Sequence, residues 1–236
     1  MPSCARKIAY LAIFLNLLDF TFSYSNTIKK PIPSTNHIKN IQKKILHIAN
    51  RLMEDLPISY VYGGSQVTSI NSCQSCTECL LHKSPRSKNR LIKCPSCKNC
   101  SLDCSHFTQL VYKLAGLDTP YLDTRSMLNI NPRSLLKNYH LVSIPHLSLA
   151  QAGDLLVYKG HVVILERAHN ISRGDIIHAT GGKDIKEPGQ GIQRERNVII
   201  QSFRGQLKRI FRHKKLIPRH YEHNSSHMQS SGSNHQ

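Results

Sequence analysis

Two cysteine triplets of identical spacing constrain the fold of this chain more than any other feature of its sequence. Residues 73–79 read CQSCTEC and residues 94–100 read CPSCKNC, so both follow the pattern C-x2-C-x2-C. Their positions are symmetric about a common midpoint, and a hairpin-like path of the chain would bring the two triplets together. The symmetric pairs are Cys73 with Cys100, Cys76 with Cys97, and Cys79 with Cys94.

Two kinds of cross-link fit these cysteines equally well. Four thiolates from two C-x-x-C pairs make a tetrahedral zinc site, and the spacing between the triplets is close to that of a zinc ribbon. Three nested disulfides would instead use all six cysteines, and an exported chain usually forms disulfides. The candidate zinc ligands are Cys76, Cys79, Cys97 and Cys100, or alternatively Cys76, Cys79, Cys94 and Cys97.

The second triplet runs on as CPSCKNCSLDC, which has the spacing of an iron–sulfur ferredoxin. Cys104 is better explained as the start of the following helix than as a fourth cluster ligand, because Asp103 before it is a suitable helix N-cap. The number of cysteines supports this separation of Cys104. Removing an N-terminal signal that contains Cys4 leaves seven cysteines, of which six can pair and one stays free. Apolar residues then recur with helical spacing at Phe107, Leu110, Val111 and Leu114.

At the start of a helix, Cys104 has the position of a nucleophile. The free N–H groups and partial positive charge of a helix N-terminus lower a thiol pKa and can stabilise an oxyanion. A thiol also needs a base, and His161 opens a β-like run directly after a hairpin turn signal, Lys159-Gly160. His178 lies in the next run. Two adjacent antiparallel strands can place the two imidazoles side by side, so that one takes the proton and the other fixes its tautomer.

Five motifs occur in one order along the chain: YVYGG at 60–64, DCS at 103–105, AGDLLVY at 152–158, GHVVIL at 160–165 and IIHAT at 176–180. The series resembles the NlpC/p60 family of papain-like cysteine peptidases, over roughly residues 38–181 without the cysteine-rich insert. The resemblance implies an α+β, papain-like fold in which helices pack on a small antiparallel sheet. It also implies that catalysis needs no cofactor, so a structural zinc ion in the insert is the one cofactor under consideration.

The resemblance also implies a role for each matching residue. Cys104 matches the nucleophile, His161 the general base, and His178 the polar residue that orients this base. Tyr60 matches a tyrosine whose hydroxyl lies near the nucleophile. Two positions depart from the family, which has glycine where this chain has His106 and Val163; a bulkier residue at 106 narrows the cleft or supplies a charge. The positions that shape substrate binding are Asp103 and Ser105.

The function that the resemblance implies is hydrolysis of peptidoglycan stem peptides, at the D-γ-glutamyl–diamino acid bond or a related amide. A muramoyl-peptide amidase or an acyltransferase on the same fold is an alternative. A zinc-finger-like nucleic-acid-binding protein is a rival of another class, because 32 Lys and Arg residues against 14 Asp and Glu give a formal net charge of +18. Such a charge attracts polyanions, including nucleic acid, anionic lipid and acidic wall polymers. The export signal and the Cys/His set favour the peptidoglycan or muropeptide substrate over nucleic acid.

The sequence divides into segments of different character. Basic residues followed by a short apolar run predict a signal peptide, and hence export to the periplasm or cell envelope. A helix is expected over 38–56, stopped by Pro57, and strands over 154–158, 161–166 and 175–180. The expected segments are a signal peptide at 1–25, a linker at 26–37, a catalytic domain at 38–205 with a cysteine-rich insert at 67–101, and a basic, His/Ser-rich, disordered tail at 206–236.

Overall fold

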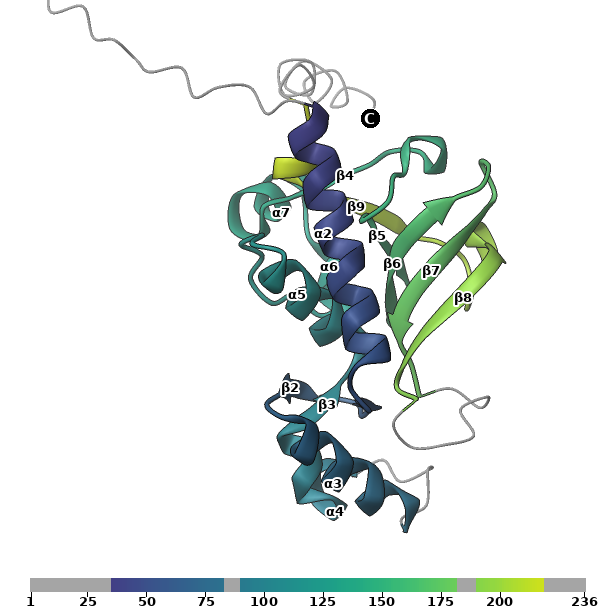
Figure 1. The fold of residues 1–236 in the computed structure, drawn as a ribbon. Helices are drawn as coiled ribbons and strands as arrows, with labels where there is room; N and C mark the ends of the chain where they lie inside the picture. The colour runs from purple at the N-terminus through teal and green to yellow at the C-terminus, as the bar shows by residue number, and fades with distance from the viewer. Residues whose placement is uncertain (1–34, 83–89, 182–189, 219–236) are drawn as a thin grey trace, which may run out of the picture. The chain divides into compact units, whose positions relative to one another are not determined.

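A six-stranded antiparallel sheet runs through the part of the chain that the structure describes. This structure is a computed structural model, and it describes residues 35–82, 90–181 and 190–218. The strand order is β4-β9-β5-β6-β7-β8, and the expected strands at 154–158, 161–166 and 175–180 are confirmed as β5, β6 and β7 (Figure 1). The bounds are Leu141–Ser143 for β4, Leu155–Tyr158 for β5, His161–Ala168 for β6, Arg173–Ala179 for β7, Ile192–Ile199 for β8 and Arg209–His213 for β9.

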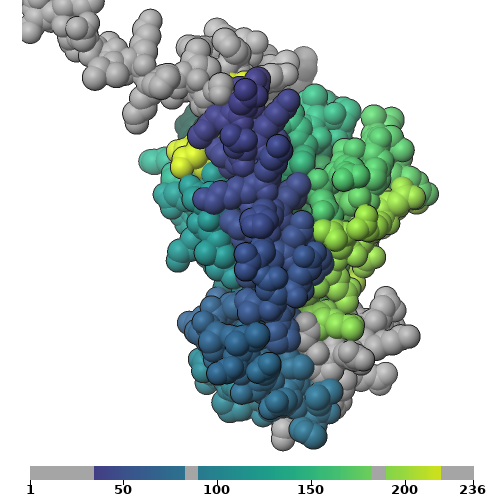
Figure 2. All heavy atoms as spheres, in the orientation of Figure 1, coloured from purple at the N-terminus to yellow at the C-terminus, as the bar shows by residue number. Residues whose placement is uncertain are grey.

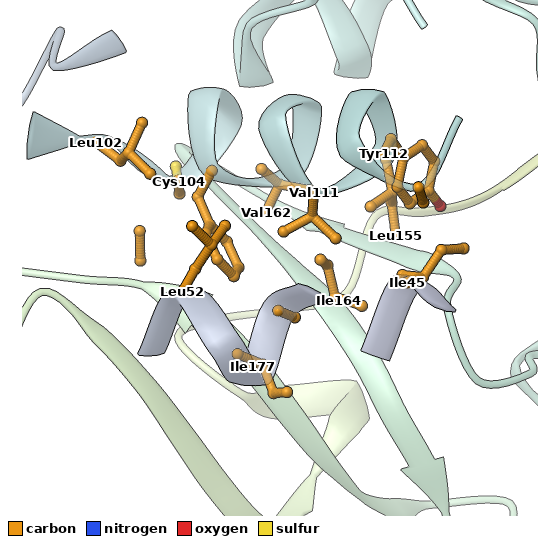
Figure 3. Packing of buried hydrophobic residues seen from close by; sticks show 14 of the residues in the cluster. Ile45, Leu52, Leu102, Cys104, Val111, Tyr112, Leu155, Val162, Ile164 and Ile177 are labelled. Atoms are coloured by element: carbon orange, nitrogen blue, oxygen red, sulfur yellow. The ribbon is translucent and has the colours of Figure 1, made fainter. Parts of the chain in front are cut away.

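Two helices, α2 (Thr35–Glu54) and α5 (Cys104–Leu114), share an apolar core with this sheet. Figure 2 shows the residues of α2 covering the middle of the face in view. Helix α2 ends at Glu54, two residues before the end that was expected at residue 56 from the position of Pro57. This mixture of helices and antiparallel strands agrees with the predicted α+β class. The core residues that meet between the two helices and β6 include Ile45, Leu52, Val111, Val162 and Ile164 (Figure 3).

Capped short helices connect α5 to the sheet. Helix α6 (Thr124–Asn129) begins at its N-cap Asp123, whose side chain accepts hydrogen bonds from the first turn. Helix α7 (Pro132–Tyr139) begins in the same way at Asn131 and has proline at its first position. Short 3-10 turns also occur in the second half of the chain, at η3 (Leu147–Leu149), η4 (Ile200–Ser202) and η5 (Lys214–Leu216).

A separate three-stranded sheet lies in the segment that leads to Cys104. Strand β3 (Cys100–Leu102) runs between β1 (Ser59–Tyr60), to which it is parallel, and β2 (Ser65–Val67), to which it is antiparallel. Since Asp103 and Cys104 directly follow β3, this sheet fixes where the helix α5 begins. The same sheet holds Tyr60 at the end of β1.

All six cysteines of the insert form disulfides, nested as one of the two alternatives predicts. Helix α3 (Ile70–Leu81) carries one triplet, and α4 (Arg90–Lys93), η2 (Pro95–Lys98) and β3 surround the other. The sulfurs of the alternative zinc site are therefore not thiolates in this structure, and in the ranges described no group of three or more His, Cys, Asp or Glu side chains could hold a metal. The disulfides are Cys73–Cys100, Cys76–Cys97 and Cys79–Cys94.

Breaking the Cys73–Cys100 disulfide is expected to destabilise the main core more than breaking Cys79–Cys94. Cys73 and Cys100 are buried in the same apolar cluster as α2 and α5, whereas Cys79 and Cys94 belong to a separate, smaller cluster built mainly from insert residues. We expect Cys73→Ser/Cys100→Ser to lower the free energy of unfolding by about 2–5 kcal/mol. Urea denaturation of both double variants measures the difference, and equal losses would contradict this division of the two clusters.

Strand β9 corrects the expected C-terminal boundary at residue 205. Residues 206–236 were expected to form a disordered tail, but β9 pairs with β4 on one side and with β5 on the other. Ile210, Phe211 and Leu216 are buried. The folded domain therefore extends at least to residue 216, and the part of the expected tail at 219–236 lies outside the described residues.

The same strand supplies a buried ion pair. Nε and Nη2 of Arg212 each donate a hydrogen bond of 2.8 Å to the carboxylate of Asp154, and Nη2 also reaches the carbonyl oxygen of Leu149 at 2.7 Å. Asp154 is fully buried, at 0% exposure. Burial raises the pKa of this carboxyl group, and the hydrogen bonds and charge of Arg212 act in the opposite direction.

The three disulfides indicate that this protein folds in an oxidising compartment. The signal peptide expected at 1–25 and most of the linker expected at 26–37 lie outside the described residues, which begin in α2 at Thr35. Across the three described ranges, no helix combines the length and the apolar character that crossing a membrane requires.

Candidate active site

Cys104 is the first residue of α5 and is 5% exposed. Its helix begins there because the side chain of Asp103 accepts a hydrogen bond of 2.8 Å from the backbone N–H of His106, as the sequence predicts for an N-cap. The backbone N–H of Val162, the residue after His161, favours the ionised form of the Cys104 sulfur. Figure 3 shows Cys104 at the start of its helix, with Leu102 and Val162 nearby. The structure thus brings the cysteine to the beginning of β6.

Burial raises the pKa of the Cys104 thiol above its ordinary value. The N–H of Val162 lowers it, the charge of Asp103 raises it, and the N–H groups at the helix start lower it again. The helix N-terminus lowers this pKa as expected, but the desolvation of an ionised sulfur outweighs its contribution, so the net shift is upward. The resting sulfur is a protonated thiol near neutral pH, and it needs a base to become a nucleophile.

The two predicted histidines lie side by side on adjacent antiparallel strands. Nε2 of His161, the first residue of β6, is 2.7 Å from Nδ1 of His178 on β7. Burial lowers the pKa of His161 to about 4. It also lowers the pKa of His178 to about 3, with a smaller contribution from the charge of His161. Both imidazoles are therefore neutral near neutral pH, so one nitrogen of this pair carries the hydrogen and the other accepts it.

The segment after η4 covers the histidine pair. The ring of Phe203 lies 5.4 Å from that of His178 and 6.5 Å from that of His161, measured between centroids. Arg204 follows in the left-handed region at φ 47°, with its guanidinium 5.8 Å from the centroid of the Phe203 ring. Its positive charge contributes to lowering the pKa of both histidines. This arrangement keeps His161 unprotonated, as a general base must be.

Lowering the pH from 7 to 4 is expected to destabilise the folded protein. Burial lowers the pKa of His213 to about 4, as it does for His161, whereas an unfolded histidine has a pKa of about 6.5. Between these values the unfolded chain binds more protons, so the free energy of unfolding falls as the pH falls through this window. Thermal denaturation at pH 7.5 to 4 measures the effect. His213→Gln should reduce the slope, and a melting temperature independent of pH would contradict the prediction.

Tyr60 lies at the end of β1, close enough to Cys104 for the charges of Cys104 and Asp103 to affect it. Burial, followed by these two charges, raises its pKa to about 12. The hydroxyl therefore stays protonated and can donate a hydrogen bond. The ring packs against Gly181, where a Cβ would overlap Tyr60. Gly181, directly after the IIHAT motif, thus helps to hold Tyr60 in place.

A network of polar side chains surrounds the helix start. Oδ1 of Asp103 accepts hydrogen bonds from Oγ of Ser105 at 2.9 Å and from the backbone N–H of His106 at 2.8 Å. Oδ2 of Asp103 accepts from the N–H of Gly63 at 3.2 Å, which links the YVYGG and DCS motifs. The His106 ring stacks on Tyr121, with centroids 4.1 Å apart. The bulkier residue at 106 therefore forms an aromatic pair near Cys104.

Some contacts and residues of the site were not foreseen. Among the described residues, no hydrogen bond joins the Cys104 sulfur to the His161 ring. The sulfur instead interacts with the backbone N–H of Val162, the residue that follows His161. Sequence reasoning missed Tyr121, Phe203, Arg204 and Glu195, and no motif marks them. Glu195 has one readable signal, since it lies in a polar run, QRER at 193–196, whose alternation fits an edge strand.

No protein-family model matches the chain, and no curated protein is significantly similar to it.

Proposed function

We propose that the protein is a cysteine hydrolase of the NlpC/p60 type, with a papain-like fold, that cleaves stem peptides of peptidoglycan. The observation that carries this proposal is the His161–His178 hydrogen bond of 2.7 Å at the start of β6, where Cys104 also lies. A helix-borne cysteine beside a strand-borne histidine, itself held by a third polar residue, is the constellation of papain-like hydrolases. The substrate class comes from the resemblance of the five ordered motifs to the NlpC/p60 family.

In the first half of the proposed reaction, the Cys104 thiol attacks the amide carbonyl carbon while Nδ1 of His161 takes its proton. Nδ1 is the ring nitrogen available, because Nε2 faces His178. The N–H groups at the start of α5 stabilise the negative oxygen of the tetrahedral intermediate. His161 then returns the proton to the amine nitrogen as the C–N bond breaks, which leaves a thioester on Cys104.

In the second half, water attacks the thioester carbonyl. His161 takes a proton from this water and returns it to the sulfur as the C–S bond breaks, so the thiol is restored and a carboxylic acid is released. Hydrolysis of this kind needs no cofactor. The hydroxyl of Tyr60 stays protonated because of its raised pKa and can donate a hydrogen bond to the substrate. Asp103 and Ser105 shape the binding site beside the stacked His106 and Tyr121.

Two alternative enzymes on the same site differ from the peptidase in the amide bond that they cleave or in the molecule that accepts the acyl group. An amidase would use the same residues at the sugar–peptide junction, and an acyltransferase would pass the acyl group to an amine instead of water. The nucleic-acid-binding alternative loses support, because the cysteines that it would use as zinc ligands are cross-linked as disulfides. Export to the periplasm or cell envelope is part of the proposal, with the basic charge holding the enzyme to an anionic wall or membrane surface.

Incubation with purified muropeptides, followed by mass spectrometry, tests the proposal. The peptidase predicts cleavage between D-γ-glutamate and the diamino acid, whereas the amidase predicts release of the whole stem peptide. An added amine would be incorporated by an acyltransferase. His161→Ala should lose at least ~100-fold in rate, the usual contribution of a general base. Full activity in this variant would contradict the site assignment. No cleavage of any amide, together with salt-sensitive DNA binding, would favour the nucleic-acid alternative.

A further inference from the structure

The histidine pair leaves one buried nitrogen without a partner. His178 is fully buried, at 0% exposure, and among the described residues its Nε2 has no hydrogen-bond partner. An unsatisfied buried N–H costs about 1–3 kcal/mol, so such an atom calls for an explanation. Oε1 of Glu195, on the neighbouring strand β8, lies 3.6 Å away, and the Glu195 side chain is 38% exposed.

The register of the sheet explains why Glu195 faces this nitrogen. Strands β7 and β8 pair His178 with Gln193 and Ile176 with Glu195. Residues two apart on a strand share a face, so Glu195 is the diagonal neighbour of His178. The next residue back, Arg194, has the opposite orientation and bonds to Glu166 and Asn50. Glu195 is thus free of that ion pair and faces the buried imidazole.

The chemistry of the pair fixes where each hydrogen must be. For Nδ1 of His161 to accept the thiol proton, its hydrogen must sit on Nε2, which then donates to Nδ1 of His178. Nδ1 of His178 must in turn be bare, so the hydrogen of that ring is on Nε2, the atom that faces Glu195. The opposite set of tautomers would place a hydrogen on Nδ1 of His161 and block the base.

We propose that Glu195 is a positioning residue, whose carboxylate accepts the Nε2–H of His178 and thereby selects the tautomer that leaves His161 able to take the Cys104 proton. This inference rests on the proposed function, in which His161 is the general base. A small rotation of the partly exposed carboxylate shortens the 3.6 Å separation to a hydrogen bond. When His161 becomes positively charged, the same carboxylate stabilises the charge through His178. Arg204, on the covering segment, is the other charge that acts on both rings.

Two variants of Glu195 separate its possible contributions. Glu195→Ala removes the acceptor, whereas Glu195→Gln keeps an acceptor oxygen and removes the charge. Glu166→Gln is the matched control, because it removes one carboxylate from the same sheet at the Arg194 ion pair. Nitrogen NMR of the imidazoles reports which nitrogen of His178 carries hydrogen. Alkylation of Cys104 by iodoacetamide, followed from pH 5 to 9, reports how readily the thiol loses its proton without any substrate.

We expect hydrogen on Nε2 of His178 in the unmodified protein, in Glu195→Gln and in the control. Glu195→Ala should shift the hydrogen toward Nδ1 and slow both alkylation at pH 7 and muropeptide hydrolysis about 10-fold or more, as for loss of an outer-shell partner. Glu195→Gln should lose less than Glu195→Ala. An unchanged tautomer and unchanged alkylation in Glu195→Ala would overturn the inference. If no muropeptide is cleaved but the tautomer and alkylation change as expected, the inference stands and the proposed substrate is wrong.

Discussion

Cys104→Ala is expected to abolish hydrolysis of muropeptides, with a loss of at least ~10⁴-fold in kcat, because removing the nucleophile of a catalytic set disables the whole set. The substitution should leave the fold intact. It removes only the sulfur atom of a residue that is 5% exposed, and the helix cap at Asp103 does not depend on this atom. Product formation followed by mass spectrometry over hours measures the loss.

Thr108→Ala is the matched control for this experiment. Thr108 is also buried in α5, one turn after Cys104, and its hydroxyl donates a hydrogen bond to the backbone oxygen of Ser105. Its removal should change kcat by no more than about 3-fold, because it touches none of the reacting atoms. Substantial hydrolysis by Cys104→Ala, under conditions where Thr108→Ala is active, would show that another residue is the nucleophile.

Arg212→Ala is expected to lower the free energy of unfolding by about 3–5 kcal/mol, which is the usual cost of leaving a buried charge without its partner. Arg212 is 7% exposed, and its guanidinium donates two hydrogen bonds to the carboxylate of Asp154, which is fully buried. The loss of the guanidinium leaves the Asp154 carboxylate with only the backbone N–H of Gln151. Urea denaturation followed by circular dichroism gives the free energy.

Arg51→Ala provides the comparison, because Arg51 forms an ion pair with Asp55 on the surface of α2. An exposed pair of this kind contributes about 0–1 kcal/mol, so this variant should be almost as stable as the unmodified protein. If both arginine variants lost the same small amount of stability, β9 would not be a structural strand of the central sheet. The measurement therefore also tests the corrected domain boundary.

Local patterns predicted strands β5, β6 and β7 and the helices that surround the site, but they missed three strands of the large sheet, β4, β8 and β9. Strand β9 reads RIFRH, and its arginines made it resemble part of a basic tail. Only the fold shows that Arg212 finds a buried partner in Asp154, 58 positions away along the sequence. Strand β8 was missed because its middle, QRERN, is polar, as an edge strand with one solvent-facing side can be.

The two histidines were predicted together because each lies in an apolar run that marks a strand. Glu195 lies in the polar strand β8, and Phe203 and Arg204 follow η4, so no apolar pattern marks these three residues. The cross-link chemistry of the insert could not be predicted from spacing, since C-x-x-C suits both zinc and disulfides. The structure adds that α3 is a helix. A spacing of three on a helix places its cysteines along one face, each opposite a different partner, whereas a zinc knuckle turns both cysteines of a pair toward one point.

The small sheet has a consequence for how sequences of this kind can vary. Val67 and Cys100 are direct partners in the pairing of β2 with β3, so the chain leaves this sheet and returns to it at adjacent positions. A tight turn of a few residues could close the same gap, as in an ordinary β-hairpin. The segment between them is thus an appendage on a hairpin, whose length can change in evolution while the path from Tyr60 to Cys104 keeps its register.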